Sequence, residues 1–137
     1  MKLTPESIPQ VALDFMNRDH AEFVRLRDKL LDLLAARTPV EQLQGALDEL
    51  AEHTRRHFAA EEQVMLETGF PAYHVHKGEH DNVLAEMAAQ VERWQRGHDS
   101  ESLRNWIDQD VGDWLLGHVG SMDFVTAHFI DTQQKGR

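Results

Sequence analysis

Cysteine is absent from the 137-residue chain. Its absence excludes disulfide bonds, zinc sites built from thiolates and ordinary iron–sulfur clusters. Any metal ion bound by this sequence must therefore be held by imidazole and carboxylate groups. Those groups are plentiful, since the chain has nine histidines and 24 aspartates and glutamates, and histidine is the commonest metal ligand among the side chains.

Long hydrophobic runs and an excess of basic residues are also missing. No apolar stretch is long enough to span a bilayer, and the N-terminal residues MKLTPESIPQ lack the apolar segment of a secretory signal. A cytoplasmic location is expected by default. The formal net charge of −10 argues against nucleic acid and against a membrane surface as partners, because both are bound through clustered lysine and arginine.

The spacing of apolar residues predicts four long helices and no strand. The helices are expected over residues 18–36, 38–67, 71–96 and 99–132. Four amphipathic helices joined by short turns predict an all-α fold, an antiparallel up-down-up-down four-helix bundle. Residues 1–16 contain Pro5 and Pro9 and are expected to form an extended N-terminal arm, so that residues 17–137 make up a single bundle domain.

Residues at the expected helix ends follow known capping preferences. Thr38 is expected to cap the second helix, with Pro39 at its first position and Glu41 where a capping-box glutamate stands. Gly69 suits the left-handed residue that ends this helix. The fourth helix is expected to be capped by Asp99 or by the serine that follows it.

Five histidines and one glutamate fall on the helix faces that point into the bundle. They recur at steps of three and four, in phase with apolar residues such as Leu50, Val83 and Ile107. These polar residues are His20, His57, Glu61, His76, His80 and His118. Burying so many polar groups is costly unless each is paired. A single inward histidine is usually a hydrogen-bonded core residue, but a set of this size on four helices favours a metal site.

Asp123 is a further candidate ligand, five residues after His118. In an ideal helix five residues turn through about 500°, which would direct Asp123 away from His118 and leave it as an exposed acid. We therefore predict a distortion near Gly120, either a π-type bulge or a break. Five imidazoles and two carboxylates exceed the needs of one ion and suit two ions bridged by the carboxylates. Such donors favour zinc, iron, copper or nickel.

This pattern resembles the hemerythrin family, in its single-domain bacterial form. The family pattern is a lone histidine on the first helix, His-x-x-x-Glu on the second, His-x-x-x-His on the third and His-x-x-x-x-Asp on the fourth. All seven positions are filled here, by His20, His57 with Glu61, His76 with His80, and His118 with Asp123. The resemblance extends from about residue 16 to 125 and includes the neighbouring segments HFAAEE, GFP and WLLGH.

The resemblance implies a non-haem di-iron centre. Two iron ions would be bridged by an oxo or hydroxo group and by the carboxylates of Glu61 and Asp123. His20 and His57 would hold the iron that keeps an open position for O2 or another small diatomic molecule, and the other three histidines of the set would hold the second iron. The segment before His20 lacks the aspartate-x-glutamine often found there in the family, and no tryptophan precedes it. The arm over the open iron is therefore expected to differ.

Five apolar residues close in sequence to the candidate ligands are expected to form a dry wall around the open iron: Phe23, Val24, Phe58, Leu115 and Val119. Simple core packing is the alternative for each of them, and it is favoured for Trp114. The remaining histidines are expected at the surface, although His53 lies one turn from His57; they are His53, His74, His98 and His128. Four acids are expected on solvated faces: Glu62, Glu67, Asp108 and Asp110.

Three functions are compatible with this set of residues. The first is reversible binding of O2, for transport, storage or sensing, and it is favoured because the ligand set is complete and no separate catalytic base is evident. The second is a di-iron enzyme that acts on peroxide or nitric oxide at the same open iron. The third is an iron-binding or iron-sensing module without a role in gas binding. An oxygen-binding protein is thus preferred over an enzyme.

Overall fold

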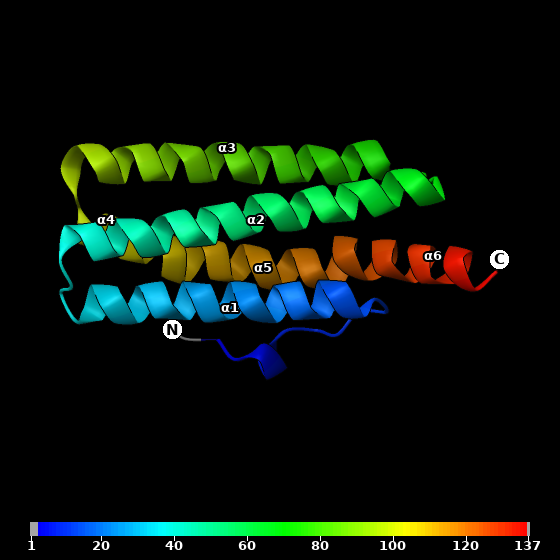
Figure 1. The fold of residues 1–137 in the computed structure, drawn as a ribbon, viewed down its shortest axis with the longest axis horizontal. Coiled ribbons are helices and arrows are strands. Elements are labelled where there is room, and N and C mark those ends of the chain that lie inside the picture. The colour runs from blue at the N-terminus through cyan, green and yellow to red at the C-terminus, as the bar shows by residue number, and fades with distance from the viewer. Residues whose placement is uncertain (1–2, 137) are drawn as a thin grey trace.

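A computed structural model of the protein describes residues 3–136. Four helical rods make up most of this structure. The first three rods are α1 (Asp14–Ala35), α2 (Val40–Thr68) and α3 (Tyr73–Gly97). The fourth is a continuous helix of five parts, α4 (Ser100–Asn105), η2 (Trp106–Val111), α5 (Gly112–His118), η3 (Val119–Asp123) and α6 (Phe124–Lys135). No strand occurs over residues 3–136. The rods run side by side along one axis (Figure 1), so the predicted all-α four-helix bundle is confirmed.

Two of the predicted helix-end residues are confirmed, whereas other helix ends differ from the prediction. Gly69 ends α2 in the left-handed region, at φ 67°, and Asp99 caps α4, because its side chain accepts a hydrogen bond from the Ser102 amide. The prediction that Thr38 caps α2 is wrong, since Pro39 holds the capping position and no side chain caps this end. The third helix begins at Tyr73, two residues after Pro71.

The core lies along the common axis of the rods and is built from the predicted apolar faces. Leu30, Leu47, Leu50 and Ile107 are completely buried, and they come from α1, α2 and η2. Each such side chain contributes about 1.5–3 kcal/mol by leaving water. No helix in the described part of the chain is both long and apolar enough to cross a membrane.

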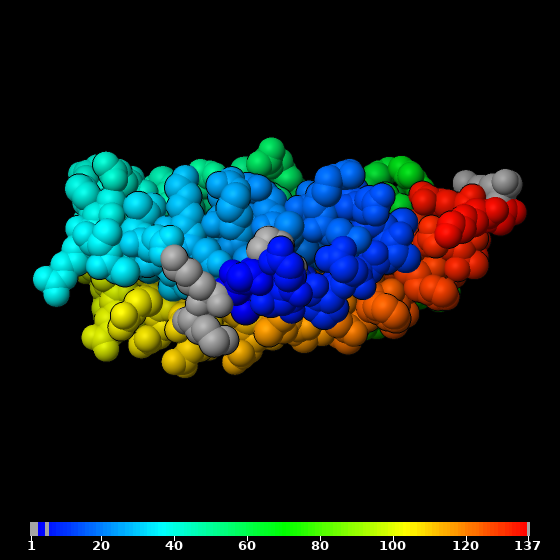
Figure 2. Space-filling view, turned by 90° about the horizontal axis from the view of Figure 1, so that it is seen from below, coloured from blue at the N-terminus to red at the C-terminus, as the bar shows by residue number. Residues whose placement is uncertain are grey.

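The N-terminal arm packs on the bundle instead of standing free of it. It contains a short 3-10 turn, η1 (Pro5–Ser7), and its buried side chains include Leu3, Ile8 and Val11. Val11 is fixed by two hydrogen bonds of 2.9 Å with the Asn17 amide group. Figure 2 shows the arm, in dark blue, lying over α1 and the orange part of the fourth rod. Residues 14–16, which were expected in the arm, belong to α1.

Two π-helical segments interrupt the fourth rod. The segment η3, Val119–Asp123, lies where a distortion near Gly120 was predicted, so that prediction is confirmed. The segment η2, Trp106–Val111, was not predicted. A π-helix bonds each amide to the carbonyl five residues earlier, so it holds more residues in each turn than an α-helix does. The two segments therefore change which faces of α5 and α6 point toward the core.

A buried arginine on α1 is fastened to η2. Arg27 is 1% exposed, and its guanidinium donates hydrogen bonds to the carbonyls of Ile107, at 3.0 Å, and Asp108, at 2.9 Å. Its remaining nitrogen donates to Asp28. The guanidinium lies against Gly112, where a Cβ atom would come within 3.0 Å of Arg27 Nη2. A side chain at position 112 would therefore crowd this contact.

Replacing Arg27 by methionine should destabilise the bundle strongly. The two η2 carbonyls would lose their charged donor, and Asp28 would lose its ion pair, so we expect the free energy of unfolding to fall by about 3–5 kcal/mol. Urea denaturation followed by circular dichroism measures this change. The matched control is Arg25→Met on the same helix, because Arg25 is exposed and pairs only with Glu22 among the contacts described; its effect should stay below about 1 kcal/mol. Equal effects of the two variants would contradict this account of Arg27.

Candidate metal centre

All seven candidate ligands meet in the middle of the bundle. They come from every rod, and each is at most 8% exposed: His20, His57, Glu61, His76, His80, His118 and Asp123. Their donor atoms fall into two groups, in each of which all atoms lie within 4.8 Å of one another. Glu61 and Asp123 belong to both groups. The arrangement is that of two adjacent positions for cations that share two carboxylates.

The larger group has three imidazoles and one oxygen from each carboxylate. Glu61 Oε1 lies 3.2 Å from His80 Nε2 and 3.5 Å from His76 Nε2. Asp123 Oδ1 lies 3.1 Å from His76 Nε2 and 2.9 Å from His118 Nε2. Two ligand atoms held at a right angle, each about 2.1 Å from an ion, are about 3 Å apart. These separations therefore suit atoms that surround one ion.

The smaller group has two imidazoles and the other oxygen of each carboxylate. His57 Nε2 lies 2.7 Å from Glu61 Oε2. His20 Nε2 lies 2.9 Å from Asp123 Oδ2 and 3.9 Å from Glu61 Oε2. Each carboxylate thus directs one oxygen to each group. The smaller group has one imidazole fewer, so an ion there would have one more position free for an added ligand.

The π segment η3 brings Asp123 to this centre. Because hydrogen bonds in a π-helix join residues five apart, residues 118 and 123 share a face that they would not share in an α-helix. The result is the distance of 2.9 Å between His118 Nε2 and Asp123 Oδ1. The alternative of an exposed Asp123 is wrong, because the side chain is 1% exposed.

Four of the five imidazoles are oriented by a hydrogen bond from Nδ1, on the side away from the centre. In each case the acceptor lies on another rod. The pairs are His57 with Asp19 at 2.8 Å, His76 with Thr126 at 2.7 Å, His80 with Glu62 at 2.9 Å and His118 with Glu79 at 2.7 Å. Such bonds fix the ring and direct Nε2 toward a metal ion. His20 is the exception, since its buried Nδ1 has no partner.

The sequence reasoning missed these four acceptors. Glu62 was expected on a solvated face, and that prediction is wrong because its carboxylate is half-buried and accepts the bond from His80. A signal was present, since Asp19, Glu62 and Glu79 each stand next to a ligand in the chain. Each of these three acids points toward a neighbouring helix and accepts a hydrogen bond from a candidate ligand there. Thr126 offered no comparable signal.

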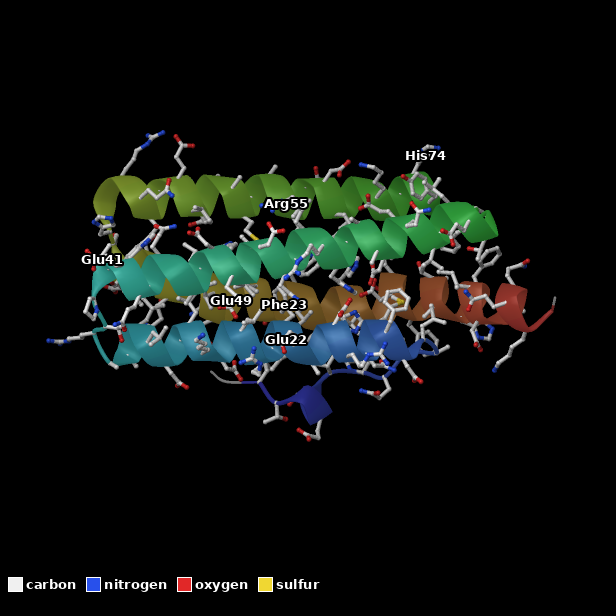
Figure 3. All side chains as sticks on the ribbon, viewed as in Figure 1. Glu22, Phe23, Glu41, Glu49, Arg55 and His74 are labelled. Atoms are coloured by element: carbon white, nitrogen blue, oxygen red, sulfur yellow. The ribbon has the colours of Figure 1, made fainter. Side chains whose placement is uncertain are left out.

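The remaining predictions for polar residues have mixed outcomes. His74, His98 and His128 are exposed as expected, and Figure 3 shows His74 pointing away from the bundle. The prediction for His53 is wrong, because its ring is half-buried, bonds to the Asp19 carbonyl at 3.0 Å and stacks over His57. Glu67 and Asp110 are exposed as expected, whereas Asp108 is half-buried against Arg27.

Aromatic rings cover the larger group. Phe58 stacks on His80 with ring centroids 3.8 Å apart, and Trp114 stacks on His118 at 4.6 Å. Trp114 also donates a hydrogen bond to Glu79, on the oxygen that accepts from His118. The five apolar residues expected around the open iron are all buried, namely Phe23, Val24, Phe58, Leu115 and Val119. That these five residues surround a bound gas molecule remains a prediction.

Buried polar atoms without a hydrogen bond are concentrated in this centre. Six such side-chain atoms occur in the described part of the chain, and five belong to the seven candidate ligands: His20 Nδ1, both Glu61 oxygens, His80 Nε2 and Asp123 Oδ1. Leaving buried polar atoms unpaired costs about 1–3 kcal/mol each. A bound metal ion would satisfy the carboxylate oxygens and His80 Nε2, so the residues present fit metal ions held by imidazole and carboxylate.

The carboxylates and imidazoles also shift each other's pKa values. Burial lowers the pKa of His57, but the charge of Glu61 and the hydrogen bond to Asp19 outweigh burial and raise it to about 10. Burial likewise lowers the pKa of His76, but the adjacent carboxylates of Asp123 and Glu61 raise it to about 9. Burial raises the pKa of Glu61, yet the charge of His57 more than offsets burial and holds it below its usual value. The pKa of Asp123 is lowered in the same way by the surrounding histidines.

These shifts predict how stability depends on pH once metal has been removed with a chelator. The histidine pKa values are raised, so their stabilisation is complete below about pH 6.5 and is lost as the pH rises through 9 to 10. The carboxylate pKa values are lowered, so their stabilisation is present above about pH 4 and is lost as the pH falls below that value. The Tm of the chelated protein should therefore decline below about pH 4 and again as the pH rises through 9 to 10.

Thermal melts at closely spaced pH values test this expectation. His57→Gln should reduce the alkaline decline in Tm, whereas the control His74→Gln should leave it unchanged because His74 is exposed. A Tm that stays constant above pH 10 in the chelated protein would show that the histidines of the centre are not the stabilised cations.

Comparison with known proteins agrees with this geometry. Residues 11–128 match the model of the hemerythrin HHE cation binding domain. The chain belongs to the hemerythrin family. It is 32% identical over 127 residues to a bacteriohemerythrin of Aquifex aeolicus, an overlap that covers 93% of this chain and 96% of that protein. It is 35% identical over 106 residues to a bacteriohemerythrin of Ralstonia nicotianae, which covers 77% of this chain and 72% of the relative. No solved structure matches the chain.

A further relative is the bacteriohemerythrin of Stenotrophomonas maltophilia, which is 28% identical over 116 residues, covering 82% of this chain and 71% of the relative. The hemerythrin resemblance noted in the sequence is therefore confirmed. Membership of this family implies that the centre binds non-haem iron.

Proposed function

We propose that this chain is a non-haem di-iron protein that binds O2 reversibly, for transport, storage or sensing. His76, His80 and His118 would hold one iron ion, and His20 and His57 the other. Glu61 and Asp123 would bridge the two ions, together with an oxo or hydroxo group. The observation that carries this proposal is the unequal division of the imidazoles, three and two, around two shared carboxylates.

The unequal division favours binding of an added ligand at one ion only. With the carboxylate oxygens counted, the larger group offers five donor atoms and the smaller group four. When bound, a pair of iron ions supplies the electrons for reversible reduction of O2. The chain itself would hold the ions and exclude water, since Phe58 is buried and stacks on His80.

The surrounding residues favour a binding protein over an enzyme. Among the described residues, the titratable side chains that converge on the centre all belong to the proposed ligand set. The nearby carboxylates of Asp19, Glu62 and Glu79 are engaged by imidazole Nδ1 atoms. The described residues therefore leave no unengaged carboxylate beside the centre to act as a general acid or base for turnover. The cytoplasmic location expected from the sequence belongs to the same proposal.

An optical spectrum tests the proposed O2 binding. The iron-loaded protein should gain visible absorption bands in air and lose them when O2 is removed, through repeated cycles. Irreversible oxidation by air, with turnover of peroxide or nitric oxide, would favour the enzyme instead. A protein that takes up only zinc and stays colourless would contradict any role of iron.

Iron content measures the roles of individual ligands. His20→Ala should keep the larger group and bind about one iron ion per chain, with loss of the O2-dependent bands. His118→Ala removes a ligand of the larger group and should lower iron content further and reduce the Tm. The control His74→Ala should retain two iron ions, because His74 is exposed and points away from the bundle. Unchanged iron content in His118→Ala would remove His118 from the ligand set.

A further inference from the structure

A pocket of about 370 Å³ opens on the bundle beside the metal centre. Its walls come from α1, α3, η2 and α5. The pocket reaches Glu79 and Trp114, which both contact His118. It is therefore separated from a proposed metal ligand by one layer of side chains, yet it contains none of the seven candidate ligands. Its lining has two chemical features, aromatic rings and carboxylates.

Three aromatic rings line the pocket. Phe23 and Trp106 are each 6% exposed, and Trp114 is half-buried. The Trp114 ring lines the pocket and also stacks on His118. The hydrogen bond from Trp114 Nε1 to Glu79 fixes the ring in place. Rigid aromatic rings attract cations through the negative charge of their faces.

Three carboxylates line the same pocket, and no basic side chain does. They are Glu79, Glu86 and Asp110. Glu86 accepts a hydrogen bond from the neutral amide of Gln90, and Glu79 accepts from His118 and Trp114. None of the three forms an ion pair with lysine or arginine in the described residues. Other surface acids do form such pairs, as in Lys77 with Asp81. The pocket therefore carries negative charge that its own walls do not neutralise.

We propose that this pocket binds a small organic monocation with an aromatic or aliphatic body. The aromatic rings would contact the body and attract the charge, while Asp110 and Glu86 would neutralise it. A neutral molecule of similar shape would gain only the apolar contact, and an anion would be repelled. The volume limits the ligand to a small molecule, because ligand pockets in proteins span about 300–1,000 Å³. This proposal goes beyond O2 binding and does not depend on it.

Isothermal titration calorimetry on the iron-loaded protein tests the proposal with three probes that share one ring. Benzyltrimethylammonium is the cation, benzyl alcohol the neutral probe and phenylmethanesulfonate the anion. We expect the cation to bind with a Kd below about 1 mM and at least about fivefold more tightly than the neutral probe. The anion should not bind. Equal affinities for the three probes, or no saturable binding of the cation, would overturn the proposal.

Substitutions then place the binding in this pocket. Asp110→Asn removes one exposed carboxylate and should weaken cation binding about two- to fivefold, while Val83→Trp should fill the pocket and abolish binding. The matched control is Glu41→Gln, at the far end of α2 (Figure 3), which makes the same change in net charge. Thermal melts confirm that each variant is folded. Equal weakening by Asp110→Asn and Glu41→Gln would assign the effect to net charge and overturn the proposed site.

Discussion

The structure depends on two buried carboxylates, which five imidazoles surround in the interior of the bundle. Glu61 and Asp123 are each 1% exposed, and an uncompensated buried charge costs several kcal/mol. Every rod therefore contributes side chains that compensate the pair, and the rods must pack with those side chains in register. The apolar faces supply the free energy of packing, but the polar centre determines which relative positions of the rods are acceptable.

The hydrogen bonds from the imidazole Nδ1 atoms connect each rod to the next. Asp19 on α1 orients His57 on α2, and Glu62 on α2 orients His80 on α3. Glu79 on α3 continues the series to the fourth rod. In each pair the acid stands next to a ligand of its own helix, so one helix turn both supplies a ligand and orients an imidazole of the next rod. A small shift of one rod would consequently disturb the ligands of its neighbour as well.

The sequence predicted the parts of this design that follow from helical periodicity. Steps of three and four placed His57, Glu61 and the other polar residues on inward faces, and the interval of five before Asp123 required a distortion that η3 supplies. Contacts between the rods were harder to predict from the sequence. The role of Glu62 and the contact between Arg27 and η2 depend on how two helices are rotated against each other, and amphipathic patterning fixes that rotation only roughly.

The two π segments give the fourth rod a tolerance for changes in length that the other rods lack. Losing one residue from an α-helix turns everything after it by about 100°, so a deletion between His57 and Glu61 would separate the pair. In η2 or η3 the surplus residue of the wide turn can be removed as the turn tightens into an ordinary α-helical one. The loss of one residue from η3 should therefore disturb the centre less than the loss of one residue between His57 and Glu61 in α2.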